Sequence, residues 1–263
     1  MVELDKKEVI NNKNEAINKI NEYLDNCIIQ DDKHLKKANL LSYWLKDYFR
    51  YLEQEEVFNS SCLKEYSRGD IIKVNLGFNV GNEEGGLHYC VVLDKKNAKS
   101  YSTLTVIPLS SIKNTTKSNK TSVSLGEEIY NSLFDKCNYL IDKGRNEIHI
   151  LRQEMQELKV LPENTEEERI VKEYRMSTLD RKLFANQENL ELILKINNEL
   201  SQMKKGTIAL ANQITTISKQ RIYNPKKDLD ILSGIKLSAE KMSLIDKKIK
   251  ELYIIIRIDK NVM

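Results

Sequence analysis

The chain has 263 residues, 40% of them hydrophobic, so it is long enough to bury the core of one or two domains. Its 42 Lys and Arg residues nearly balance 39 Asp and Glu residues, and the formal net charge of +3 excludes binding to a long nucleic-acid duplex through overall positive charge. Any nucleic-acid site must therefore be local.

The four cysteines are widely separated, with no C-x-x-C pair and no nearby histidine at metal-ligand spacing. This pattern is typical of reduced thiols in the cytoplasm and predicts no metal site. The amino-terminal sequence MVELDKKEVI is charged from its third residue, and apolar runs such as YIII are too short to cross a bilayer. We therefore expect a cytoplasmic protein that is neither exported nor inserted into a membrane.

The first part of the chain is predicted to be helical. Residues 1–58 contain neither Gly nor Pro, and their apolar residues recur at spacings near 3.6, first within 9–28 and again within 41–52. The spacing predicts two amphipathic helices in an N-terminal helical region, residues 1–60. The second helix carries Trp44 and Tyr48 on a surface apolar enough to predict contacts with the rest of the chain or with a partner.

Strand-like patterns follow in two separate stretches of the chain. Some alternate apolar and polar residues, and one is continuously apolar, as in a strand that is buried on both faces. Together they predict a small antiparallel barrel or sandwich. The segments are DIIKVNLGF (70–78), YCVVL (89–93), STLTVIPLS (102–110), a strand near residue 123 and TIALANQI (207–214).

Between these stretches the pattern becomes helical. From Leu125 to Leu158 apolar residues follow one another every three or four positions, which predicts one long helix that ends before Pro162. Thr165 followed by Glu168 is a capping-box sequence, and it predicts a return helix with two asparagines on its apolar seam.

The sequence thus predicts a helical hairpin at residues 127–203, inserted into a barrel formed by 61–126 and 204–263. The hairpin either lies on the barrel or projects from it as an antiparallel coiled coil. Because closing a loop costs little per added residue, a short linker in place of the hairpin is expected to preserve a folded barrel. A closing helix with Ser238 as its N-cap is predicted to pack on the barrel.

Two blocks of sequence carry a further signal, RGDIIKVNLGFNVGNEEGGLHYCVVLDKK with STLTVIPLSS, and then GTIALANQITTISKQRI. Their glycines, strands and turns, in this order, resemble the MazF/PemK family of toxins from type II toxin–antitoxin systems, over about residues 66–123 and 205–256. The resemblance implies an α+β protein built on an SH3-like antiparallel barrel. It also implies a homodimer that cuts single-stranded RNA without a metal or another cofactor and is neutralised by a cognate antitoxin.

Three positions depart from that family. His88 stands where members typically carry arginine, Ser110 where they carry threonine, and Asn212 where Asp or Glu is frequent. The resemblance therefore predicts the fold more strongly than the activity.

The predicted catalytic residues are His88 and Ser110. Metal-free RNA cleavage needs a group that accepts the 2'-OH proton, a group that protonates the leaving oxygen, and donors for the charged phosphorane. Histidine changes charge near neutral pH and can transfer protons, and a serine hydroxyl can donate to a phosphate oxygen. Alternatively, His88 caps the strand through backbone hydrogen bonds, and the Ser110–Ser111 pair forms an ordinary turn.

The predicted RNA-binding residues lie in the loops around this pair, although such polar loops are often only solvated. They are Asn79, Glu83, Ser111, Lys113, Asn212 and Gln213.

An alternative function stays open from the sequence. CcdB-like toxins share this fold and act on a protein target without being nucleases. A barrel that lacks the usual arginine and acidic residue is also compatible with a non-catalytic binding module that acts on a protein partner.

Overall fold

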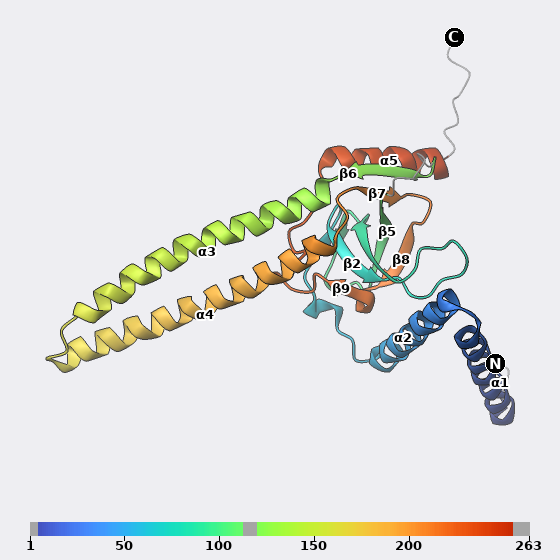
Figure 1. Ribbon diagram of the computed structural model, residues 1–263, viewed down its shortest axis with the longest axis horizontal. Helices are drawn as coiled ribbons and strands as arrows, with labels where there is room; N and C mark the ends of the chain where they lie inside the picture. The colour runs from blue at the N-terminus through green and yellow to red at the C-terminus, as the bar shows by residue number, and fades with distance from the viewer. Residues whose placement is uncertain (1–4, 113–119, 255–263) are drawn as a thin grey trace, which may run out of the picture. The chain divides into compact units, whose positions relative to one another are not determined.

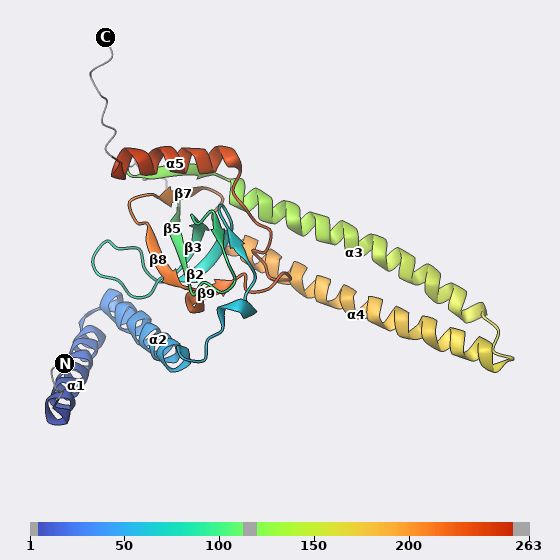
Figure 2. The same cartoon turned by 180° about the vertical axis from the view of Figure 1, so that it is seen from behind.

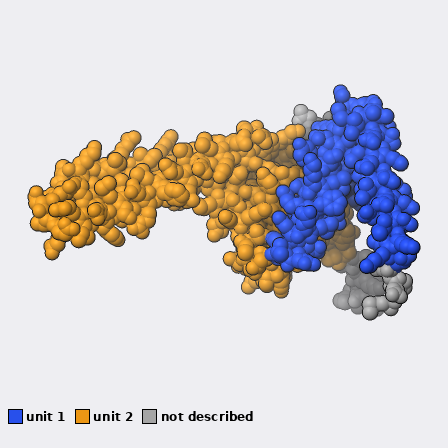
Figure 3. All heavy atoms as spheres, turned by 90° about the horizontal axis from the view of Figure 1, so that it is seen from below, with its two compact units in different colours: residues 1–58, 76–86 blue, residues 59–75, 87–263 orange. Residues whose placement is uncertain are grey.

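The structure is a computed structural model that describes residues 5–112 and 120–254 (Figure 1). The chain forms two compact units, one of residues 1–58 with 76–86 and the other of residues 59–75 with 87–263 (Figure 3). Lys113, predicted to bind RNA, lies outside the described residues. The three-part domain division predicted from the sequence stays a prediction.

The first unit contains the two predicted helices, α1 (Lys6–Gln30) and α2 (Asp32–Gln54). Asp31 caps the second, because its carboxylate accepts a hydrogen bond from the His34 backbone N–H at 2.9 Å. Within the two helices only Cys27 and Ala38 are buried, so most of their apolar side chains are exposed. The two predicted helices are confirmed, whereas the contacts predicted for their apolar residues stay a prediction.

The second unit is built on antiparallel strands. The main sheet has the order β6-β7-β5-β3-β2-β9, and β8 also pairs with β5. β7 and β8 lie along the same side of β5, one after the other, and β3 lies along its other side. The strands are β1 (Tyr66–Ser67), β2 (Ile71–Asn75), β3 (Leu87–Val92), β4 (Lys96–Asn97), β5 (Thr103–Ser111), β6 (Ser122–Gly126), β7 (Thr207–Leu210), β8 (Thr215–Ser218) and β9 (Ile222–Asn224).

The structure confirms the antiparallel sheet predicted from the sequence. It also confirms that the protein combines this sheet with helices. Within residues 5–112 and 120–254 no pairing joins the outer strands β6 and β9, so hydrogen bonding does not close the sheet. The SH3-like barrel accordingly stays a prediction. The continuously apolar segment YCVVL forms much of β3, and Cys90, Val91 and Val92 are all fully buried, which explains why the strand lacks alternation.

The inserted hairpin consists of α3 (Glu128–Val160) and α4 (Glu166–Gln202), which run side by side in both views of the molecule (Figures 1 and 2). The predicted capping box is present, because the Thr165 hydroxyl accepts from the Glu168 N–H and the Glu168 carboxylate accepts from the Thr165 N–H. With 33 residues, α3 is about 50 Å long.

The base of the hairpin belongs to the core of the sheet. Six hairpin residues join the strands in one buried cluster, namely Ile129, Leu133, Cys137, Leu192, Ile196 and Leu200. The far half of the hairpin forms a separate small cluster of Leu151, Leu158 and Leu179. The shared core argues against the expectation that a short linker could replace all of residues 127–203, because the linker would remove part of the core.

The predicted seam of the hairpin is only partly buried. Ile148, Met155 and Leu190 follow the three-four spacing, yet they are 46%, 44% and 57% exposed. Spacing along one helix predicts which side chains share a stripe. It does not predict how much of that stripe a single neighbouring helix can cover.

The closing helix α5 (Ala239–Tyr253) packs on the same core through Met242 and Ile245, as predicted. The Ser238 hydroxyl caps it by accepting from the Lys241 N–H at 3.3 Å. Arg68 from the family-like sequence RGD pairs with Asp246 of this helix. No helix in the described part of the chain is long and apolar enough to cross a membrane.

Candidate functional site

The candidate site is a pocket of about 330 Å³ in the second unit, where β3 begins, β5 ends and α4 ends. Such a volume is at the lower end of the range for small-ligand sites, about 300–1,000 Å³. It is lined by Lys73, Leu87, His88, Tyr89, Leu109, Ser110, Ser111, Glu199, Gln202, Met203, Lys204 and Thr207.

The half-buried His88 lies near the start of β3, and its Nδ1 atom is 3.3 Å from the carbonyl oxygen of Leu109. A carbonyl can only accept a hydrogen bond, so this contact favours the neutral tautomer with the proton on Nδ1 and the lone pair on Nε2. The arrangement fixes the ring and makes Nε2 the basic nitrogen. It is also the backbone contact that a purely structural histidine would make.

Ser110 and Ser111 end β5 and are both half-buried. β7 pairs with them on one side, with Ser110 opposite Ile208 and Ser111 opposite Thr207. On the other side of β5, the register that sets Cys90 opposite Pro108 would set His88 opposite Ser110 if it continued. The sheet therefore brings His88 and Ser110 to the same end of two neighbouring strands.

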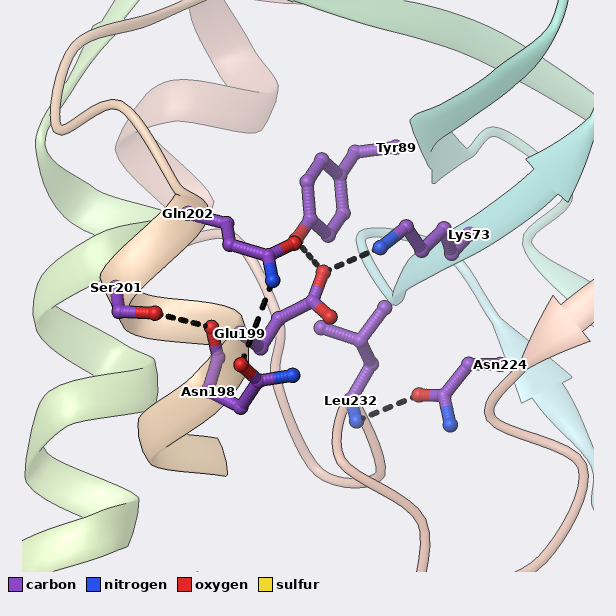
Figure 4. Close-up of polar contacts among 8 residues, drawn as sticks. All are labelled: Lys73, Tyr89, Asn198, Glu199, Ser201, Gln202, Asn224 and Leu232. Atoms are coloured by element: carbon purple, nitrogen blue, oxygen red, sulfur yellow. Dashed lines mark hydrogen bonds and ion pairs between the residues drawn. The ribbon is translucent and has the colours of Figure 1, made fainter. Parts of the chain in front are cut away.

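A second polar cluster in the pocket was not predicted from the sequence. Glu199, in the last turn of α4, accepts hydrogen bonds from the Lys73 ammonium and the Tyr89 hydroxyl (Figure 4). The Lys73 ammonium also lies 5.1 Å from the centre of the Tyr89 ring. The sequence held only a weak signal for this cluster, because Glu199 immediately precedes the seam residue Leu200 and its partners are far away along the chain.

The Lys73–Tyr89–Glu199 cluster is largely withdrawn from water. The side chains of Lys73 and Glu199 are only 19% and 17% exposed. Burial, and then the hydrogen bond to Glu199, raise the pKa of the Tyr89 phenol well above its usual range, so the hydroxyl remains a donor at neutral pH. The cluster thus presents one carboxylate held by two donors.

Strand alternation separates the two groups of side chains. Lys73 pairs with Tyr89, and the neighbouring pair is Val74 with His88. Because successive residues of a strand point to opposite faces, Tyr89 and Lys73 share one face of the sheet and His88 projects to the other. The pocket is lined by residues of both groups at the point where β3 begins.

Four other predicted RNA-binding residues do not line this pocket. Asn212 and Gln213 form the turn between β7 and β8, on the opposite side of β5 from β3. Asn79 and Glu83 belong to the first unit, in the loop that joins β2 to β3. There the Asn79 amide donates to the Glu84 carbonyl at 2.7 Å, and the Glu83 carboxylate accepts from the Val80 N–H at 3.2 Å.

The glycines of that loop have a steric role. The Gly86 N–H donates to the Gly77 carbonyl at 2.6 Å, and a Cβ atom on Gly85 would lie 2.8 Å from the same oxygen. The close approach of the two backbone segments therefore requires Gly85.

The fold and site thus define an α+β protein with a histidine- and serine-lined pocket at one end of an antiparallel sheet. Residues 67–145 match the family of PemK-like, MazF-like toxins of type II toxin–antitoxin systems. For these residues the match confirms the resemblance to that family seen in the sequence. Comparison with curated proteins gave no significant match.

The family match covers the strands β2 to β6 and the first half of α3. It contains the predicted catalytic residues His88 and Ser110 and excludes Glu199 on α4. The predicted resemblance over residues 205–256 lies outside the match and stays a prediction.

Proposed function

We propose that this toxin is an endoribonuclease that cleaves single-stranded RNA, such as mRNA, by attack of the ribose 2'-OH on the adjacent phosphate, without a metal ion. The observation that carries the proposal is the meeting of His88 and Ser110 in one pocket of the family domain. His88 can accept the 2'-OH proton and return it to the leaving oxygen, and Ser110 can donate a hydrogen bond to the phosphorane, so the pair can supply the functions that the reaction needs.

In the proposed reaction, Nε2 of His88 accepts the 2'-OH proton while the 2'-oxygen attacks phosphorus. The Ser110 hydroxyl donates to a non-bridging oxygen of the phosphorane, where negative charge accumulates. When the bond to the 5'-oxygen breaks, the imidazolium returns the proton to that oxygen. The products are a 2',3'-cyclic phosphate and a 5'-OH end, and His88 is regenerated.

We expect purified protein to cleave mixed-sequence single-stranded RNA in the presence of a chelator and to leave these two ends. Mass spectrometry of the fragments identifies the ends directly. A matched RNA with 2'-deoxyribose at the cut site should resist cleavage, because it lacks the attacking group. Cleavage of the 2'-deoxy substrate, or fragments with a 5'-phosphate, would overturn the mechanism.

A second candidate function is a non-catalytic, CcdB-like module that binds a protein target. It is favoured by the 3.3 Å contact between His88 and the Leu109 carbonyl, since a structural histidine makes the same contact. Absence of RNA cleavage by the wild-type protein, together with toxicity in cells, would favour this alternative.

We further propose that the protein acts in the cytoplasm as a homodimer and that a cognate antitoxin neutralises it. Family membership supports the antitoxin. The homodimer is testable in solution, where light scattering should give about 61 kDa, twice the 30.6 kDa of one chain. A mass of one chain at micromolar concentration would contradict the dimer.

A further inference from the structure

The inserted hairpin contributes one wall of the pocket. Glu199, Gln202, Met203 and Lys204 come from the last turn of α4 and the residues that follow it. They face strands from the family domain, although they lie outside the family match. The insertion therefore adds chemical groups to the candidate active site in addition to extending away from it.

Glu199 is the central group of this wall. Its Oε1 atom accepts from both Lys73 and Tyr89, which fixes the carboxylate (Figure 4). Within the described residues, its Oε2 atom has no hydrogen-bond donor. A carboxylate that is held by one oxygen and open at the other is an acceptor site for a donor from a ligand.

The surroundings of Glu199 suit one nucleotide. Leu87 and Met203 offer apolar surface to a ring, and the Gln202 amide can donate and accept at a base edge. The pocket volume of about 330 Å³ fits a nucleotide-sized group and not a longer piece of chain. His88 and Ser110 line the same pocket, so a nucleotide bound there would lie next to the phosphate at which they act.

We propose that Glu199 recognises the exocyclic amino group of a base beside the cleaved phosphate. The helical insertion would then determine part of the specificity for RNA sequence. This inference rests on the proposed function, because it takes RNA as the ligand. An ionised carboxylate only accepts hydrogen bonds, so it favours adenine, guanine or cytosine, which carry an amino group, over uracil, which has none.

The test measures binding separately from cleavage. Short RNAs with a single 2'-deoxyribose at the cut site resist cleavage, and fluorescence anisotropy gives their affinity. The bases beside the cut are varied in pairs that differ at the amino position: adenine against purine, guanine against hypoxanthine, and cytosine against uracil. At one position, wild-type protein should bind the amino-bearing base at least about tenfold more tightly, the usual size of a charge-assisted hydrogen bond. Equal affinity within every pair would overturn the proposal without any variant.

Glu199→Gln then separates recognition from anchoring. The amide carbonyl can still accept from Lys73 and Tyr89, while the NH2 group replaces the open acceptor Oε2 with a donor. We expect the preference for the amino-bearing base to disappear or reverse. An equal loss of affinity for both members of each pair would show that Glu199 only anchors the hairpin, and would overturn the proposal.

Glu154→Gln is the matched control. Glu154 also pairs with a lysine, Lys182, but it lies in the far half of the hairpin and does not line this pocket. The control should keep the wild-type preference. If the protein cleaves RNA but shows no base preference, the role proposed for Glu199 is wrong and the nuclease proposal stands. If it binds with a base preference but does not cleave all-ribose RNA, the nuclease proposal is wrong and the role of Glu199 stands.

Discussion

Replacement of His88 by alanine should lower the rate of RNA cleavage by about 10²–10⁴-fold, the usual effect of removing a proton-transfer group. The fold should persist, because His88 is only half-buried and is not a member of the buried core cluster to which Leu109 belongs. Single-turnover cleavage of a fluorescent RNA measures the rate, and circular dichroism checks the fold.

Two further variants separate proton transfer from strand capping. His88→Asn retains a side-chain N–H that can donate to the Leu109 carbonyl but cannot transfer a proton, so it should be as inactive as His88→Ala. His88→Arg restores the typical family residue, which stays charged at all physiological pH values, and should flatten the pH dependence of cleavage between about pH 5 and 8. Full activity in His88→Asn would show that the histidine is structural.

Excision of the whole hairpin, residues 127–203, should unfold the second unit. The cut removes six buried residues from the common core, among them Leu133 and Ile196, which are fully buried. Truncating a single such residue to alanine typically costs about 2–5 kcal/mol of the free energy of unfolding. Six such losses sum to about 12–30 kcal/mol, which equals or exceeds the total stability of an ordinary domain, about 5–15 kcal/mol.

A shorter excision provides the control. Gly144 of α3 faces the side chain of Asn186 on α4, since a Cβ on the glycine would lie 3.9 Å from the asparagine Oδ1. Joining these two positions by a few Gly and Ser residues removes 145–185 and only the separate Leu151, Leu158 and Leu179 cluster. This protein should unfold cooperatively in urea, whereas the full excision should show no transition. A cooperative transition in the full excision would show that the core of the sheet is independent of the hairpin.

Local patterns predicted most of the elements correctly. Thr165 and Glu168 marked the start of α4, Ser238 marked the start of α5, and the apolar run at residues 89–93 marked a buried strand. Each of these signals depends on residues within a few positions of one another, so the sequence carries it completely. The MazF/PemK-like motif around His88 was recognisable for the same reason.

The Glu199 cluster could not be predicted in this way. Lys73 and Tyr89 are separated from Glu199 by 126 and 110 positions, and no periodicity links residues so far apart. Nor could the spacing of apolar residues show that Leu133 and Ile196 complete the core of a sheet while Ile148 stays half exposed. Burial depends on which elements meet in space, and one helical stripe looks the same in either case.

The sequence by itself indicated the helices, most of the longer strands and the resemblance to the toxin family, because turns, caps and hydrophobic periods are local. Only the tertiary structure decided that His88 contacts the Leu109 carbonyl and that Ser110 lines the same pocket. It also decided that the end of the insertion brings Glu199 to Lys73 and Tyr89. The physical reason is that a site is formed by side chains from different elements, and their meeting is set by strand register and core packing.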